Sequence, residues 1–167
     1  VKDTFGEGSP RGEAEGKVNP VRDKAPEAPD GCLRQPISNG VKIYSLRTTA
    51  PKAIKEILDE ISVFSGSLKE ALQKTLVLAI SKSGATIETV SHKKYFEELY
   101  MKLALDIKKH MWVITDKGSP MDTGDYEQRE IQLNGRGDIG GRFTSPTTNI
   151  FLLPLAIVDP QRIKAVL

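Results

Sequence analysis

The stretch Lys74-Thr-Leu-Val-Leu-Ala-Ile-Ser-Lys-Ser-Gly-Ala-Thr-Ile-Glu-Thr89 decides the fold of this chain. Residues 76–80 form an unbroken apolar run, which is typical of a strand covered on both faces, as in a parallel sheet. Residues 81–86 supply hydroxyls, a lysine and a glycine, and a helix is expected to begin near Ile87. Because the first-turn N–H groups of a helix have no partner within it, they favour an anion in such a loop. The stretch therefore predicts a strand, a phosphate-binding loop and a helix.

The same loop has an explanation that needs no ligand. Ser and Thr are common immediately before helices because their side chains cap first-turn N–H groups. From these residues alone, a capping turn and a phosphate site are both open.

The rest of the chain alternates between predicted strands and helices. The strands are expected at residues 41–46, 76–80, 111–114 and 130–133, and the helices at residues 51–61, 68–72, 87–105 and 150–156. This alternation predicts an α/β fold with a right-handed parallel sheet, whose ligands bind beyond the carboxyl ends of the strands.

Two of these helices have faces that the sequence assigns. In the first, the core-facing residues are Ile54, Ile57, Leu58 and Ile61. In the helix after the loop they are Val90, Phe96, Leu99, Tyr100 and Leu103. The solvated face of that second helix is predicted at Lys93, Lys94, Glu97 and Glu98.

A second glycine-rich block, Asp138-Ile-Gly-Gly-Arg-Phe-Thr144, follows the last predicted strand. Glycines let the backbone approach a ligand closely, and the guanidinium of Arg142 is a permanent cation with several donors for oxygen. Such an arginine suits an oxygen-rich substrate. A structural salt bridge at a helix start is the alternative.

Both blocks resemble the glucose-6-phosphate isomerase family. Residues 80–89 are similar to the phosphosugar-binding loop of the sugar isomerase (SIS) domain, and residues 138–144 are similar to the family's Gly-Gly-Arg-Phe-Ser/Thr signature. Between them, His110-Met-Trp-Val-Ile-Thr-Asp116 is similar to the family's next strand and its Thr-Asp ending. The resemblance covers about residues 41–156. It implies an SIS-type (flavodoxin-like) parallel-sheet sandwich with helices on both faces.

The resemblance also implies site residues. The family's phosphate-binding positions correspond here to Ser81, Lys82, Ser83 and Thr86. Weaker substrate contacts are expected at Ser9, Gly84 and Gly141. Arg142 corresponds to the arginine near the sugar's reacting oxygens, where it favours the negative charge that develops during proton transfer. No metal site and no organic cofactor are implied.

Residues 1–40 are crowded with Pro, Gly and charge, which is the composition of a loop or a disordered arm. Within them, Gly8-Ser9-Pro10-Arg11-Gly12 resembles the family's first-strand loop, although the strand before it lacks aliphatic residues. An eroded first strand-loop-helix unit, with Ser9 reaching the ligand, therefore stays open beside the unstructured arm. Residues 41–167 are expected to form the SIS-type domain.

Composition limits the other functions. With 167 residues and a net charge of +2, the chain gives no reason to expect nucleic acid or an anionic membrane as a partner. Cys32 is the only cysteine, which excludes an internal disulfide, and no cluster of metal ligands is present. No apolar run approaches the ~20 residues that span a bilayer, and no signal peptide is evident. A soluble, cytoplasmic protein is expected.

Catalytic turnover needs acid–base groups that the family places outside the matched residues. Interconverting an aldose phosphate and a ketose phosphate requires a base that moves a proton between two carbons, and an acid–base group that opens the ring. In the family a glutamate and a histidine do this, and both lie beyond the Gly-Gly-Arg helix. His92 and His110, the only histidines, match neither position.

The chain is therefore expected to be one SIS lobe that acts on a hexose phosphate with a second lobe or in a homodimer. Two hypotheses follow. One is an aldose–ketose isomerase of glycolysis and gluconeogenesis that interconverts glucose 6-phosphate and fructose 6-phosphate. The other is a non-catalytic phosphosugar-binding or regulatory module. A segment after Leu167 that carries the family's Glu and His would favour the enzyme.

Overall fold

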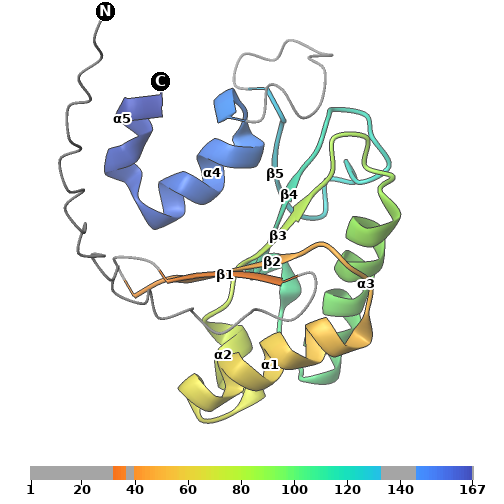
Figure 1. Cartoon of the computed structure of the whole chain (residues 1–167). Coiled ribbons are helices and arrows are strands. Elements are labelled where there is room, and N and C mark those ends of the chain that lie inside the picture. The colour runs from red at the N-terminus through yellow and green to blue at the C-terminus, as the bar shows by residue number, and fades with distance from the viewer. Residues whose placement is uncertain (1–31, 37–39, 133–145, 167) are drawn as a thin grey trace, which may run out of the picture.

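The computed structural model describes residues 32–36, 40–132 and 146–166 (Figure 1). Its strands are β1 (Cys32–Pro36), β2 (Lys42–Leu46), β3 (Val77–Ile80), β4 (Met111–Ile114) and β5 (Glu127–Arg129). Its α-helices are α1 (Pro51–Ser65), α2 (Leu68–Gln73), α3 (Ile87–Lys102), α4 (Asn149–Val158) and α5 (Ile163–Val166). Short 3-10 turns include Ile107–Lys109 and Pro160–Arg162.

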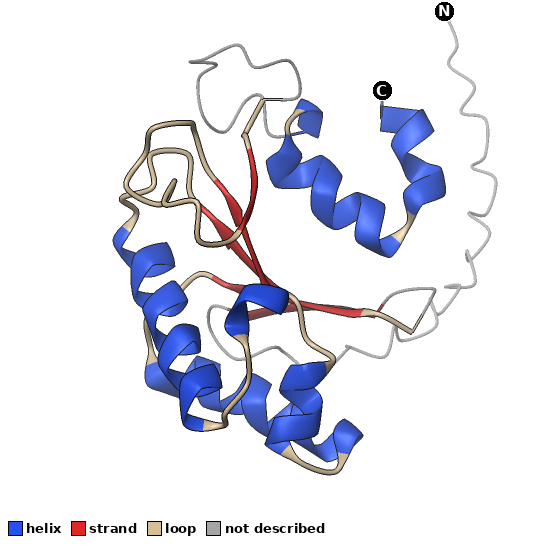
Figure 2. Ribbon diagram, turned by 180° about the vertical axis from the view of Figure 1, so that it is seen from behind, coloured by secondary structure: helices blue, strands red, loops and turns tan. Residues whose placement is uncertain are grey.

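A parallel sheet of β3, β4 and β5, in that order, forms the centre of the described chain. Val77 pairs with Met111 and Ile80 pairs with Ile114, so the two apolar runs lie side by side over their full length. In both Figure 1 and Figure 2, α3 lies on one side of this sheet and α4 on the opposite side. The predicted α/β class, with a parallel sheet and helices on both faces, is confirmed.

A second, two-stranded sheet joins β1 to β2 in antiparallel fashion, with Cys32 opposite Leu46 and Pro36 opposite Lys42. The sequence predicts β2 but no strand at residues 32–36. The segment Cys-Leu-Arg-Gln-Pro has little strand signal of its own. It forms a strand through its pairing with β2, and such context often decides β structure. Pro36 ends β1, which is consistent with the confinement of proline to the edges of sheets.

The main core lies between α1, α2, α3 and the start of β4. Its buried members are Ile54, Leu58, Leu72, Phe96, Tyr100 and Met111. The hydroxyl of Tyr100 donates to the carbonyl oxygen of Leu72 at 2.8 Å, and burial raises the pKa of this phenol to about 12. The predicted core-facing sides of α1 and α3 are confirmed at these positions, except that Val90 is 39% exposed.

Two helix ends differ from the prediction. α1 continues to Ser65, past the expected end at residue 61, and stops where Gly66 takes a φ of 85°. Glycine adopts this left-handed conformation without steric cost, so it sets the end of the helix. α3 ends at Lys102 rather than residue 105, and Ala104 follows with a φ of 51°.

β5 lies three residues before the strand predicted at residues 130–133. Its Glu-Gln-Arg sequence has no apolar alternation, and only its backbone pairing with β4 makes it a strand. Ile131 is instead buried in a bend beyond the strand, where its carbonyl oxygen accepts from the N–H of Asn149 at 2.9 Å. The apolar residue that suggested the strand therefore anchors the start of α4.

The predicted solvated face of α3 is partly covered by Tyr126. The amine of Lys93 lies 2.6 Å from the carboxylate of Glu97 and 4.6 Å from the centre of the Tyr126 ring. The Tyr126 hydroxyl donates to the same carboxylate, and burial together with this neighbour raises the pKa of the phenol. Lys94 and Glu98 are exposed as predicted.

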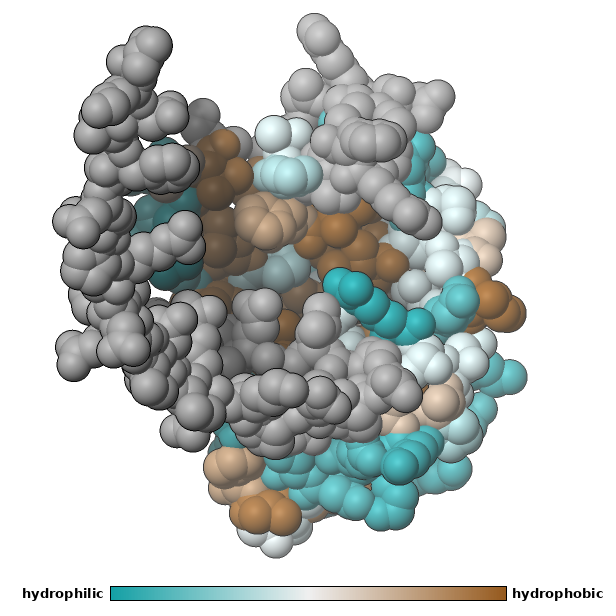
Figure 3. All heavy atoms as spheres, viewed as in Figure 1, coloured by the Kyte–Doolittle hydropathy of each residue, from teal (hydrophilic) through white to brown (hydrophobic). Residues whose placement is uncertain are grey.

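α4 consists of apolar residues after its first position. Only Leu152 is buried, whereas Phe151 is 43% exposed and Ile157 is 37% exposed. Figure 3 shows apolar, brown surface in the part of the molecule where Figure 1 places α4.

Candidate functional site

The candidate site is the loop of residues 81–86, which connects the carboxyl end of β3 to α3. The N–H of Ser81 donates to the carbonyl oxygen of Ile114 at 3.0 Å, which continues the ladder between β3 and β4. One residue further, the carbonyl oxygen of Lys82 accepts from the N–H of Asp116 at 3.1 Å. The loop is thus fixed at the sheet edge where α/β proteins bind their ligands.

Hydroxyl groups from both ends of the loop meet in its interior. The side chain of Ser81, which is 4% exposed, has its Oγ 2.8 Å from the Oγ1 of Thr86. The N–H of Thr86 donates to the same Ser81 oxygen at 3.4 Å. At the tip, Ser83 is exposed, and its Oγ accepts from the N–H of Ala85 at 3.2 Å. Two hydroxyls therefore shape the loop and a third faces outward.

Gly84 holds the loop against the turn that follows β4. Its φ is +65°, and a Cβ added there would lie 2.5 Å from the Oγ of Ser119 and 2.9 Å from the backbone nitrogen of Met121. Both the conformation and the close approach therefore require glycine at this position. The Ser119 hydroxyl lies in turn 2.6 Å from the hydroxyl of Thr115, which is fully buried.

The N-terminus of α3 opens onto this loop. Thr86 is the N-cap residue, but its side chain makes no capping hydrogen bond because the hydroxyl is paired with Ser81. The first-turn N–H groups of α3 are therefore not capped by that hydroxyl, and they carry the positive end of the helix dipole. The hydroxyl of Thr89 donates backward to the carbonyl oxygen of Ile80 at 3.1 Å, which joins the helix to the strand.

The loop also carries a cation. The amine of Lys82 lies 3.3 Å from a carboxylate oxygen of Asp116, and the two side chains are 31% and 34% exposed. The site thus combines hydroxyls, a helix N-terminus and an ammonium group within residues 81–89. Together they suit an anionic group rich in oxygen.

No protein-family model matches the chain, but individual curated proteins do. A glucose-6-phosphate isomerase from Chlamydia pneumoniae is 33% identical over 121 residues, which are 72% of this chain and 21% of that protein. The corresponding isomerase from Chlamydia felis is 32% identical over 121 residues, which are 72% of this chain and 20% of that protein. The chain is a relative of the glucose-6-phosphate isomerases. It spans about a fifth of the length of these curated relatives.

Solved structures agree with the relationship. The crystal structure of a glucose-6-phosphate isomerase from Chlamydia trachomatis matches with a TM-score of 0.53 and 30% identity, over 66% of this chain and 19% of that chain. A hypothetical protein from Thermus thermophilus matches with a TM-score of 0.50 and 30% identity, over 65% of this chain and 24% of that chain. The predicted resemblance to the glucose-6-phosphate isomerase family is confirmed.

The structure brings five of the predicted site residues into one loop. These are Ser81, Lys82, Ser83, Gly84 and Thr86. The other three, Ser9, Gly141 and Arg142, lie outside the described residues, so their roles remain predictions. In the described ranges, no group of three or more His, Cys, Asp or Glu side chains could hold a metal ion, and no helix is long and apolar enough to cross a membrane.

Sequence reasoning missed the residues that brace the loop from the β4 side. Thr115 and Asp116 entered only as the Thr-Asp ending of a strand motif, and Ser119 was given no role at the site. Their contacts with Lys82 and Gly84 join residues more than thirty positions apart, and only the parallel pairing of β3 with β4 brings them together. A polar residue directly after a predicted neighbouring strand is the signal that could have found them.

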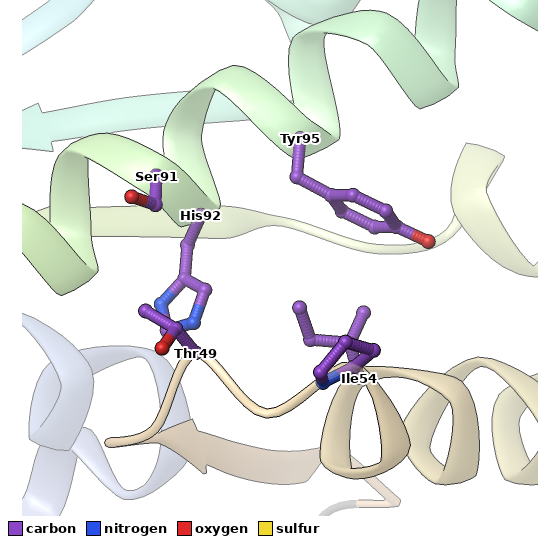
Figure 4. A pocket seen from close by; sticks show the side chains of 6 residues that line it. Thr49, Ile54, Ser91, His92 and Tyr95 are labelled. Atoms are coloured by element: carbon purple, nitrogen blue, oxygen red, sulfur yellow. The ribbon is translucent and has the colours of Figure 1, made fainter.

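A cavity of about 270 Å³ lies one turn along α3 from the loop, between this helix and the start of α1. Figure 4 shows the side chains that line it. It is lined by Thr49, Pro51, Ile54, Ser91, His92 and Tyr95. The Nε2 of His92 donates to the carbonyl oxygen of Thr48 at 2.8 Å. His110 is likewise bonded to the backbone, through its Nδ1 and the carbonyl oxygen of Thr75 at 3.2 Å. Both histidines thus have structural hydrogen bonds.

Proposed function

We propose that residues 81–86 bind the phosphate group of a hexose phosphate, and that this chain is the phosphate-binding part of a glucose-6-phosphate isomerase-type enzyme. The observation that supports this most strongly is the meeting of the Ser81 and Thr86 hydroxyls in front of the α3 N-terminus. The similarity to glucose-6-phosphate isomerases supports glucose 6-phosphate as the ligand. A homodimer or a second SIS lobe would complete the site.

The chemistry of the loop fits a phosphoryl group better than a neutral ligand. A phosphate ester carries close to two negative charges at pH 7 and offers three strong acceptor oxygens. The hydroxyls of Ser83 and Thr86, the amine of Lys82 and the first-turn N–H groups of α3 are donors that can converge on such oxygens. Hydrogen bonds that involve charged partners are roughly twice as strong as neutral ones.

Isomerisation requires more functional groups than phosphate binding does. It needs a general base and a general acid, and removing a general base typically forfeits ~10²- to 10⁴-fold in rate. Arg142, the predicted catalytic residue, stays protonated at any workable pH and cannot abstract a proton from carbon. We therefore expect the 167-residue chain to bind glucose 6-phosphate without converting it at an enzymatic rate.

The test is a titration with glucose 6-phosphate, followed by the amide signals of residues 81–89 in NMR spectra. Shifts confined to these amides are expected, together with at least ~10-fold weaker binding in a Ser83→Ala, Thr86→Ala double variant. Ser62→Ala is the matched control, because it removes an α1 hydroxyl that donates to the carbonyl oxygen of Leu58 within the same helix. Unchanged binding in the double variant would refute the assignment of the loop.

A coupled isomerase assay on the same samples tests the catalytic part. Turnover on the order of 10 s⁻¹, the median of ordinary enzymes, would show that a base and an acid lie within this chain. Binding without turnover fits both a lobe that is completed by further sequence and a non-catalytic phosphosugar-binding module. Adding the remaining sequence of a curated relative in trans separates the two, because only the incomplete enzyme gains activity.

A further inference from the structure

A carboxylate lies at the edge of the proposed phosphate site. Asp116 follows β4 at the same end of the sheet as the loop, and its N–H is bonded to the carbonyl oxygen of Lys82 at 3.1 Å. Its carboxylate is 3.3 Å from the Lys82 amine. Two independent contacts, one of the backbone and one of the side chain, therefore fix Asp116 beside the loop.

This placement sets two charges against each other. A phosphate group that takes hydrogen bonds from the Lys82 amine has to share it with the carboxylate of Asp116. The phosphate and the carboxylate then contact the same ammonium group, and the repulsion between two negative charges this close disfavours binding. Because the pair is about two thirds buried, solvent screens this repulsion less than it would at a fully exposed position.

The carboxylate is not only repulsive. It is acceptor-only when ionised, with two oxygens, and a third of the Asp116 side chain remains open to solvent. A ligand with hydroxyl groups next to its phosphate can donate to these oxygens and recover part of the loss. Inorganic phosphate as the dianion keeps a single O–H, on the group that the loop itself has to hold, whereas a sugar phosphate brings several further hydroxyls.

We propose that Asp116 is a specificity-determining residue, which weakens the binding of bare phosphate and so makes the loop select phosphate esters of hydroxyl-rich molecules. This inference rests on the proposed function of residues 81–86. It extends that function from holding a phosphate to rejecting one that carries no sugar.

The experiment measures the dissociation constants of inorganic phosphate and glucose 6-phosphate for the full chain by calorimetry at pH 8, where both ligands are mainly dianions. Asp116→Asn keeps the shape of the side chain and removes its charge. We expect it to tighten inorganic phosphate on the order of 3- to 10-fold and glucose 6-phosphate by less, so that the preference for the sugar ester falls. Asp116→Ala, which also removes the charge, is expected to act in the same direction on inorganic phosphate.

Asp125→Asn is the matched control. Asp125 also forms an ion pair, 3.5 Å from the amine of Lys108, but Lys108 lies just before β4, at the opposite end of the sheet. Removing this carboxylate is expected to leave both dissociation constants unchanged. A similar tightening in Asp125→Asn would show that net charge, rather than the position of Asp116, explains the effect, and would overturn the proposal.

A third substitution separates this inference from the function beneath it. If Lys82→Met weakens both ligands while the Asp116 variants leave inorganic phosphate binding unchanged or weaker, Asp116 positions the lysine, and only the present proposal fails. If Lys82→Met and the Ser83→Ala, Thr86→Ala variant leave both ligands unaffected, binding occurs elsewhere, and the proposed function fails with it.

Discussion

At the amino end of the parallel sheet, polar side chains bond to backbone carbonyl oxygens within the core, whereas at the carboxyl end hydroxyl groups also pair with one another around a loop. The first group comprises the Tyr100 hydroxyl on Leu72 and the His110 ring on Thr75. The second comprises the pairs Ser81 with Thr86 and Thr115 with Ser119.

The difference lies in what each arrangement leaves available. The Tyr100 hydroxyl has one hydrogen to donate, and a buried carbonyl takes it. The facing hydroxyls of Ser81 and Thr86 need only one of their two hydrogens for the pair, so we expect the other to be available to a ligand. The same chemical groups thus have their hydrogens taken up by carbonyl oxygens at one end of the sheet, and at the other end they form the loop that we propose binds phosphate.

The largest expected effect is that of a substitution in the core at the amino end of the parallel sheet. Leu72 is fully buried in the main core, so Leu72→Ala is expected to lower the free energy of unfolding by ~2–5 kcal/mol. Urea unfolding at 25 °C measures this loss. The affinity for glucose 6-phosphate of the folded fraction should not change. A folded Leu72→Ala protein with lost affinity would show that the two ends are not independent.

Gly84→Ala should distort the loop of residues 81–86 at the carboxyl end of the sheet. The new methyl group meets Ser119 at 2.5 Å, and the residue must hold a φ of +65°, so we expect a loss of ~1–3 kcal/mol in stability and at least ~10-fold in phosphate affinity. Calorimetry and urea unfolding give both values.

Gly40→Ala is the control for that substitution, since Gly40 has a φ of +74° but nothing within 4 Å of an added Cβ. It carries the same kind of backbone strain without the clash, and phosphate affinity should stay as it is. Equal losses of affinity in the two variants would mean that Gly84 matters through stability alone.

The smallest expected effect is that of Tyr100→Phe, which removes a buried hydroxyl and should cost about 1–2 kcal/mol at neutral pH without changing phosphate affinity. The pKa of this phenol is raised from 10.0 to about 12 in the folded chain, because burial favours the neutral form. Its contribution to stability is therefore complete below pH 10 and is lost as the pH rises through 12.

Urea midpoints between pH 9 and pH 12 check this sign. The wild-type chain should lose its advantage over Tyr100→Phe across that range. An advantage that stays constant to pH 12 would contradict the raised pKa.

The sequence predicted the loop at the carboxyl end of the parallel sheet better than the elements around it. Residues 76–89 carry a strand, a loop and a helix start in immediate succession, so local pattern sufficed to place β3, the loop and the start of α3. β5 was misplaced because Glu-Gln-Arg becomes a strand only through its pairing with β4. β1 was missed for a related reason, since it is a strand through its pairing with β2.

Contacts between distant residues set the limit of the prediction at the site. Ser81, Lys82, Ser83 and Thr86 could be named from one short motif. Asp116 and Ser119 could not, because their effect on the loop depends on the register of β3 against β4. Sequence reasoning thus supplied the groups that we propose contact a ligand, and the structure added the groups that hold them in place.

The close fit of Gly84 against Ser119 has a consequence for the rate of binding. A loop that is already packed on its neighbour loses little conformational freedom when a ligand arrives, so less of the interaction energy is lost to ordering the chain. Association should then occur in a single kinetic step, without the slow phase that a rearranging loop imposes. Differences in affinity among phosphorylated ligands should arise mainly from their dissociation rates.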